Sequence, residues 1–313
     1  MASKQSKRLR VAIVGGAGFA GQNVRNELES AGIETGVFSR SSGCDLMDLA
    51  TAFEKLDRFQ PTHIVNCAAH VGSVNYVRDF AADVIDHNLR MILNIYRVAQ
   101  KMREVIVVNP IANCAYPGVM DTYVESELWS GPIHPSVLSY GSARRMIDAL
   151  AQCYHWQYGV RSANVIVPNM YGPFDSTNPN KTHALNALVI KFVRAVKQGD
   201  GEVEVWGTGK PIREWLYVKD FARLTRRLVE GGGDLLEPVN LAQNHGLSVD
   251  ELVTIISEAV QFRGQIRKNT SYPDGSPKKV MDDALFRQRF PDFTFTPFEE
   301  GLRETIAYYQ SVL

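Results

Sequence analysis

Short apolar runs alternate with longer amphipathic stretches through the first half of this 313-residue chain. The runs are rich in Val and Ile and nearly continuous, as expected of strands buried on both faces, and they cover residues 11–14, 33–38, 63–66, 105–109 and 160–167. Between them, apolar residues recur at helical spacing over residues 19–31, 49–59, 80–101 and 139–158. This alternation predicts an α/β fold of the Rossmann type, a doubly wound parallel sheet with helices on both faces.

The pattern changes after Pro168, where Gly and Pro become more frequent. Helical spacing remains over residues 183–197, 218–230, 248–262 and 298–309, with short strand-like runs at 203–205 and 238–241. We expect a smaller C-terminal substrate-binding domain, with one or two segments returning to the first domain. The predicted division gives residues 1–167 plus about 215–243 to the dinucleotide-binding domain, and residues 168–214 plus 244–313 to the second domain.

Composition and charge exclude several classes of partner. The 34 basic residues balance the 34 acidic ones, so no net field favours nucleic acid or an anionic membrane. The four cysteines are widely spaced, and neither they nor the histidines show metal-ligand spacing, so we expect no metal site and no disulfide framework. The basic first ten residues precede an apolar run too short for a signal peptide or a membrane span, which predicts a cytoplasmic protein.

A glycine-rich string, GGAGFAG at residues 15–21, follows the first predicted strand and opens the first predicted helix. Glycines at such a turn allow the backbone to approach a pyrophosphate, which then lies on the helix N-terminus. A glycine string alone is weak evidence, but its place at the start of a strand–helix alternation favours a dinucleotide site.

The residues after the second strand indicate which dinucleotide binds. An acidic residue there would bind the ribose diol of NAD, but the chain has Arg40, which suits a 2′-phosphate. We therefore predict NADP, with NAD as the alternative. Asp45 is a candidate acceptor for the adenine amino group, and Asp48 has the position of a helix N-cap. The predicted cofactor-binding residues are Gly15, Gly18, Phe19, Ala20, Gly21, Arg40, Asp45, Leu46, Ala68, Ala69, Tyr140 and Arg144.

Several strings together carry a family resemblance. They are AAHVG at 68–72, CAYP at 114–117, ESEL at 125–128, NMYGP at 169–173, WGTGKPIRE at 206–214 and PDGSPKK at 273–279. With them the chain resembles the extended short-chain dehydrogenase/reductase (NAD-dependent epimerase/dehydratase) family, and within it the GDP-L-fucose synthase group, over almost its whole length. The resemblance implies a GDP-linked 4-keto-6-deoxy sugar as substrate and a homodimer formed through the helices at 80–101 and 139–158.

The proton-transfer pair of this family is a Tyr with a Lys four residues later on one helix face. Here the pair is Tyr140 and Arg144, and the cation is expected to lower the pKa of the phenol and to hold the nicotinamide ribose. Arginine supplies a fixed charge but has a larger head than lysine and keeps its proton. Where the family has a serine, this chain has Ala112, so Asn113 or Ser139 would have to take its place.

The resemblance also implies a Cys and a His that exchange protons at the carbons flanking the ketone. Cys114 and His183 lie at these positions. Read without the family, a lone Cys is more often a small buried side chain, and this His a helix-start residue. The residues that the resemblance assigns to the substrate are Asn169, His183, Trp206, Arg213 and Lys279, and the candidate catalytic residues are Tyr140, Arg144, Cys114, His183 and Asn113.

These features together favour an NADP-dependent epimerase/reductase of a GDP-linked 4-keto sugar. A nucleotide-sugar epimerase without net redox chemistry is the first alternative, because Ala112 and Arg144 change two of the three redox groups. A non-catalytic subunit that only binds the cofactor is the second alternative, against which the retained Tyr140, Cys114 and His183 argue.

Overall fold

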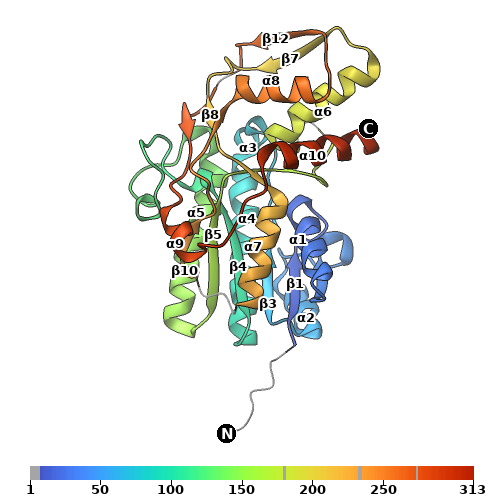
Figure 1. Cartoon of the computed structure of the whole chain (residues 1–313). Coiled ribbons are helices and arrows are strands. Elements are labelled where there is room, and N and C mark those ends of the chain that lie inside the picture. Colours follow the sequence, from blue (N-terminus) through green and yellow to red (C-terminus); the bar gives the residue numbers. More distant parts are fainter. Residues whose placement is uncertain (1–7, 179–180, 232–234, 273) are drawn as a thin grey trace.

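The computed structural model describes residues 8–178, 181–231, 235–272 and 274–313. Its main element is a six-stranded parallel sheet, which confirms the predicted α/β class (Figure 1). In spatial order the strands are β10 (Leu235–Asn240), β5 (Arg161–Val167), β4 (Ile106–Ala112), β3 (His63–Asn66), β1 (Arg10–Val14) and β2 (Glu34–Phe38). The chain leaves β1 toward β2 on one side and returns past β1 to β3 on the other, so the sheet has a switch point beside β1, where such folds bind ligands.

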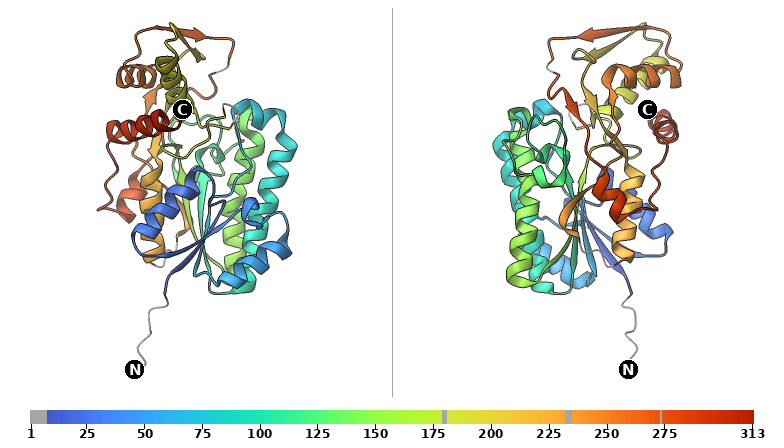
Figure 2. Two further views of the ribbon diagram at one scale, coloured as in Figure 1. Left: turned by 90° about the vertical axis from the view of Figure 1, so that its right-hand side faces the viewer. Right: turned by 60° about the vertical axis from the view of Figure 1, so that its left-hand side comes forward.

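Helices cover both faces of this sheet (Figure 2). One face carries α1 (Phe19–Ser30), α7 (Val218–Glu230) and α9 (Ala284–Arg289), and the other carries α2 (Leu49–Phe59), α4 (Ala81–Met102) and α5 (Leu138–Tyr158). Each face has its own apolar core because the inward strand positions alternate between the two, as Val11 and Ile13 do with Ala12 and Val14. The sequence pattern did not predict α3 (Val74–Asp79), which ends one residue before Phe80, the N-cap of α4.

Smaller sheets and three helices form the second region, above the carboxyl ends of the main strands (Figure 1). Helices α6 (Ala184–Gln198), α8 (Val249–Ala259) and α10 (Phe298–Val312) share its core with β7. The paired strands are β7 (Glu202–Trp206) with β12 (Gln265–Asn269), β6 (Asn169–Tyr171) with β9 (Trp215–Tyr217), and β8 (Ile212–Arg213) between β11 (Leu247–Ser248) and β13 (Lys278–Lys279). Short 3₁₀ turns are η1 (Arg40–Ser42), η2 (Asn113–Ala115), η3 (Glu125–Glu127) and η4 (Pro135–Val137).

The segment around α9 lies against the first core. Phe286 and Phe293 are almost fully buried there with residues of α7 and β1. The sequence pattern assigned this segment, with the rest of 244–313, to the second domain. The division into domains remains a proposal, and the packing of these phenylalanines argues for giving the segment to the first domain.

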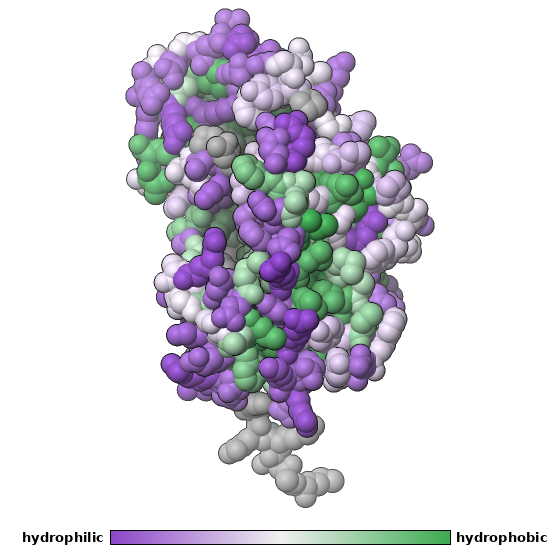
Figure 3. Space-filling model, turned by 180° about the vertical axis from the view of Figure 1, so that it is seen from behind, coloured by the Kyte–Doolittle hydropathy of each residue, from purple (hydrophilic) through white to green (hydrophobic). Residues whose placement is uncertain are grey.

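The face behind the view of Figure 1 carries apolar side chains over α4 and α5 (Figure 3). The exposed large hydrophobic side chains there include Phe80, at the start of α4, and Leu138 and Met146 of α5. Among the described residues, no helix combines the length and the apolar character needed to cross a membrane.

Candidate active site

The glycine-rich turn lies against the end of β3. Gly15 has φ +73° and donates its N–H to the Phe38 carbonyl at 2.7 Å. A Cβ at Gly15 would lie 2.5 Å from the Ala68 nitrogen, and a Cβ at Gly21 would lie 2.5 Å from the Gly16 Cα. Gly18 is the N-cap of α1 and has no side chain to accept from the first turn, so the N–H groups of that turn remain for a phosphate. The turn thus forms a cradle that a side chain would fill, which fits a pyrophosphate.

The adenosine side of the predicted site lies after β2. Arg40 is exposed in η1, and its side chain contacts no acceptor within the described ranges. Asp45 is half-buried and accepts from the Met47 N–H at 2.9 Å. Asn94 of α4 donates to the Leu46 carbonyl at 2.8 Å and so fixes this loop. The predicted N-cap role of Asp48 is confirmed, since its carboxylate accepts from the Ala50 N–H at 2.9 Å.

Arg144 is almost fully buried beside Tyr140 and the end of β3. Its Nη2 donates to the Ala68 carbonyl at 3.0 Å, and its guanidinium carbon lies 5.0 Å from the centre of the Tyr140 ring. Its Nε and Nη1 atoms are buried without an acceptor among the described residues. Buried donors need partners, and ribose hydroxyls are suitable ones. Burial raises the pKa of Tyr140 above its ordinary value, and the Arg144 charge acts in the expected direction, downward, but opposes only part of that rise.

Cys114 lies in η2, directly after β4. It interacts electrostatically with Tyr140, Arg144 and Lys279. Burial raises the pKa of the Cys114 thiol, whereas the Lys279 and Arg144 charges lower it. The backbone at Cys114 packs closely on α5 at Gly141, because a Cβ at Gly141 would lie 2.5 Å from the Cys114 carbonyl oxygen. Sequence reasoning missed Gly141, and its only signal was a glycine inside a helix next to the Tyr.

The structure distinguishes the two candidates for the role of the missing serine. The Ser139 hydroxyl donates to the Val77 carbonyl at 3.1 Å, so it serves the contact between α5 and α3. Asn113 is 6% exposed, and its Nδ2 has no acceptor among the described residues. An unsatisfied donor next to Cys114 is the feature expected of a group that binds a ligand oxygen.

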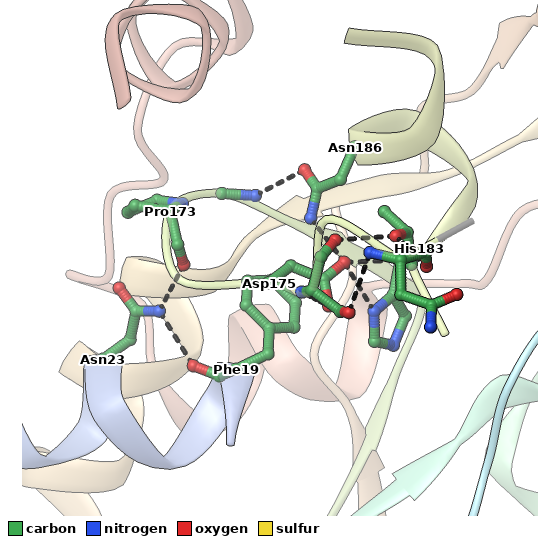
Figure 4. Close-up of polar contacts among 10 residues, drawn as sticks. Phe19, Asn23, Pro173, Asp175, His183 and Asn186 are labelled. Carbon is green, nitrogen blue, oxygen red and sulfur yellow. Dashed lines mark hydrogen bonds and ion pairs between the residues drawn. The ribbon is translucent and has the colours of Figure 1, made fainter. Parts of the chain in front are cut away.

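His183 is the N-cap residue of α6 and lies against α1 (Figure 4). Its ring centre is 5.1 Å from that of Phe19, the first residue of α1. Its Nδ1 is 3.0 Å from Oδ2 of Asp175, a buried carboxylate that sequence reasoning did not single out. No spacing rule identifies an Asp eight residues before the His. The fold thus joins His183 to the helix that begins at the dinucleotide turn.

Two cations lie side by side at the edge of the second region. Arg213 and Lys279 are register partners on the parallel strands β8 and β13, and Lys279 is 8% exposed. Burial, together with the Arg213 charge, lowers the pKa of Lys279, although Cys114 opposes this. Arg213 donates to the Asp274 carbonyl at 3.1 Å, but the described residues place no carboxylate in a salt bridge with either cation. Like charges packed together in this way indicate an anion site.

The other predicted substrate residues lie on neighbouring elements. Asn169 donates to the Glu214 carbonyl at 3.2 Å, which ties β6 to the residue between β8 and β9. Trp206 is 46% exposed and stacks on Tyr272 with ring centres 4.2 Å apart. The loop that carries Tyr272 also carries Asp274, whose carbonyl binds Arg213. Glu214, which sequence reasoning did not assign, is fully buried and accepts from the N–H groups of Gln243 and Met281.

Comparisons with known proteins agree with this geometry. The family model for the NAD dependent epimerase/dehydratase family matches residues 11–242. A GDP-L-fucose synthase of Dictyostelium discoideum is 29% identical over 316 residues, covering 99% of this chain and 97% of that protein. A probable GDP-L-fucose synthase of Oryza sativa subsp. japonica is 31% identical, covering 96% and 92%.

A solved structure gives the same result. A GDP-L-fucose synthetase of Naegleria fowleri, bound to NADP, has a TM-score of 0.88 and 27% identity, covering 99% of this chain and 95% of that one. Identity at this level does not fix a substrate. It does fix the family: this chain belongs to the NAD-dependent epimerase/dehydratase family of NAD(P)-dependent nucleotide-sugar epimerases and reductases.

Proposed function

We propose that this protein is an NADP-dependent epimerase/reductase of a GDP-linked 4-keto sugar. The observation that carries the proposal is the convergence of Cys114, Tyr140, Arg144 and Lys279 at the carboxyl end of β4. Arg144 and Lys279 both lower the pKa of Cys114, and Arg144 and Cys114 act in opposite directions on the pKa of Tyr140. Perturbed titratable groups gathered beside a dinucleotide cradle are the usual sign of an active site.

The proton chemistry divides between two sets of residues. Cys114 and His183 exchange protons at the carbons flanking the ketone, where the adjacent carbonyl stabilises the carbanion as an enolate. Tyr140 donates its phenolic proton to the 4-oxygen, and the Arg144 guanidinium stabilises the phenolate that remains. NADPH, when bound, supplies the hydride for the carbonyl carbon. Arg144 is suited to hold its ribose, the turn at 15–21 its pyrophosphate, and Arg40 its 2′-phosphate.

We assign to Asn113 the hydrogen bond to the substrate oxygen that the family serine makes. Its buried and unpartnered Nδ2 supports this role, and the commitment of Ser139 to Val77 argues against the alternative. Arg213 and Lys279 are assigned to the substrate diphosphate, because their adjacent positive charges suit an anion. Trp206 and Tyr272 present an aromatic pair to the base.

One observation favours epimerisation without net reduction. Ala112 carries no hydroxyl at the end of β4, so of the residues assigned to the ketone oxygen Asn113 and Tyr140 remain. Hydride transfer needs this changed set, including Arg144, to supply the proton for the 4-oxygen, whereas the pair assigned to exchange at the flanking carbons, Cys114 and His183, is retained.

The test is to incubate the protein with NADPH and GDP-4-keto-6-deoxymannose in D₂O and to follow absorbance and isotope uptake together. NADPH loss with deuterium beside the ketone supports the full proposal. Uptake without NADPH loss overturns the reductase and leaves the epimerase. Tyr140→Phe is expected to abolish NADPH loss and retain uptake, whereas Cys114→Ser is expected to reduce uptake.

We further propose a homodimer through α4 and α5. The support is the exposed apolar face over these helices, with Phe80 and Leu138 each about half exposed (Figure 3). A patch of this kind marks an interaction surface more often than a free one.

A further inference from the structure

Asp175 is surrounded by donors. Its Oδ2 accepts from the His183 backbone N–H and from Asn186 Nδ2, both at 2.9 Å, and lies 3.0 Å from His183 Nδ1. Its Oδ1 accepts from the Ser176 N–H at 2.8 Å. Its side chain is 4% exposed, whereas that of His183 is 40% exposed. The carboxylate is therefore held inside the protein while the imidazole reaches the surface of the site (Figure 4).

Three partners of this carboxyl group, the backbone N–H groups of Ser176 and His183 and the Asn186 side-chain NH₂, can only donate, which favours the ionised carboxylate. Burial acts to raise the pKa of Asp175, but the hydrogen bonds from His183 and Asn186 outweigh it, and the pKa lies below its ordinary value. An ionised carboxylate only accepts hydrogen bonds, so the proton between the two side chains is on Nδ1 of His183. In the neutral ring the lone pair is then on Nε2.

We propose that Asp175 is the positioning residue of His183: it holds Nδ1 as a donor, so that Nε2 is the nitrogen that exchanges a proton with the carbon beside the substrate ketone. The inference rests on the proposed function. As Nε2 bonds the proton, the C–H bond breaks, its electron pair forms the C=C bond of the enolate, and the π pair of the carbonyl moves onto the oxygen. The imidazolium so formed is stabilised by the buried Asp175 charge, and the proton returns by the reverse step or is lost to solvent.

The same loop is attached to the cofactor side of the molecule. Asn23 of α1 donates from Nδ2 to the carbonyls of Pro173 and Phe19, both at 3.0 Å. The Phe19 ring packs on His183, and the Phe19 N–H belongs to the first turn of α1. The ring plane of His183 is thus fixed by Asp175 on one side and by the dinucleotide-binding helix on the other (Figure 4).

The test uses the full chain labelled with ¹⁵N-histidine, with the His183 signals assigned by their loss in His183→Gln. At alkaline pH we expect a protonated Nδ1 and an unprotonated Nε2. Asp175→Ala removes the acceptor next to Nδ1, whereas an Asn would keep one, because its carbonyl oxygen can take the place of Oδ2 and accept from the same donors. In Asp175→Ala we expect the ¹⁵N shifts of the two nitrogens to move toward those of a mixture of tautomers, and deuterium uptake at the carbon that His183 serves to fall about 100-fold or more. Uptake at the carbon that Cys114 serves is expected to change little.

Asn23→Ala is the matched control, because it loosens the same loop without touching Asp175. It is expected to keep the wild-type tautomer, and thermal unfolding of each variant reports whether it is folded. An unchanged His183 tautomer in Asp175→Ala, or the same tautomer change in Asn23→Ala, overturns the role of Asp175. Absence of deuterium uptake in the wild type instead overturns the proposed function. The ¹⁵N spectra then still test the Asp175–His183 pairing by themselves.

Discussion

Lys279 and Arg213 stand opposite each other in register on two adjacent parallel strands, and Lys279 is buried. Two neighbouring cations repel each other, and burial adds a desolvation cost that lowers the pKa of Lys279. A bound dianion removes both penalties, which is why we assign the pair to the substrate diphosphate.

Removal of the buried charge should weaken substrate binding. We expect Lys279→Met to raise the KM for the nucleotide sugar about 10-fold or more, since a charge-assisted hydrogen bond contributes about 1.5–3 kcal/mol. Lys278→Met is the matched control, because Lys278 precedes Lys279 in β13 and is exposed. Steady-state kinetics on both variants checks this. Equal effects would show that net charge, and not the buried position, is what matters.

The glycine turn gives a test of cofactor binding. Gly15→Ala places a Cβ 2.5 Å from the Ala68 nitrogen, and we expect it to weaken NADPH binding at least 100-fold. Gly32 has the same φ of +73° with nothing within 4 Å, so Gly32→Ala isolates the cost of the backbone conformation, about 1 kcal/mol. Titration of NADPH by fluorescence should show normal affinity for Gly32→Ala. Similar losses in both variants would contradict the steric argument.

Arg40 should decide between the two dinucleotides. It is exposed and without an acceptor among the described residues, so its replacement costs little stability. We expect Arg40→Ala to weaken NADPH binding about 10- to 100-fold, in line with the loss of a bidentate phosphate contact, and to leave NADH binding unchanged. Parallel Kd measurements with the two cofactors check this, and an equal loss for both would remove Arg40 from phosphate recognition.

Glu214 should make stability depend on pH. It is fully buried, and burial raises its pKa from 4.5 to about 7, although N–H groups of Gln243 and Met281 oppose this. Because the folded state holds the proton more tightly than the unfolded chain, this contribution to stability is complete below pH 4.5 and is lost as the pH rises through 7. The difference amounts to about 3 kcal/mol at most.

The comparison is between the wild type and Glu214→Gln, which does not titrate. Urea unfolding at pH 5 and pH 8 should show a larger loss of stability for the wild type across this interval. The same pH dependence in both proteins would assign it to other groups.

The apolar face over α4 and α5 predicts the oligomeric state. We expect Leu138→Glu, which places a charge at a side chain that is 56% exposed, to convert a dimer into a monomer in sedimentation experiments. Val196→Glu is the control, at a side chain of α6 in the second region that is 43% exposed, and it is expected to leave the dimer intact. A monomeric wild type would contradict the homodimer.

The strand–helix alternation was enough to predict the fold class and most element positions. Strand β3 and helices α2 and α7 have the predicted bounds, and the other predicted strands and helices of the parallel sheet differ by a few residues at their ends. Buried parallel strands and amphipathic helices carry strong periodic signals, so local sequence is informative about them. Helices α3 and α9 were missed because six residues are too few to show a period.

The sequence by itself determined the fold class, the glycine turn and the residue types offered for catalysis, because these depend on local pattern and on motifs that are continuous in the chain. Only the tertiary structure decided which of them have partners. It gave the Ser139 hydroxyl an acceptor at Val77 and placed Lys279 beside Arg213. Within the described ranges it left Asn113 Nδ2 and two nitrogens of Arg144 without an acceptor. It also supplied Asp175 and Glu214 as buried carboxylates. Burial and hydrogen-bond geometry come from segments far apart in the chain, and no spacing along the sequence encodes them.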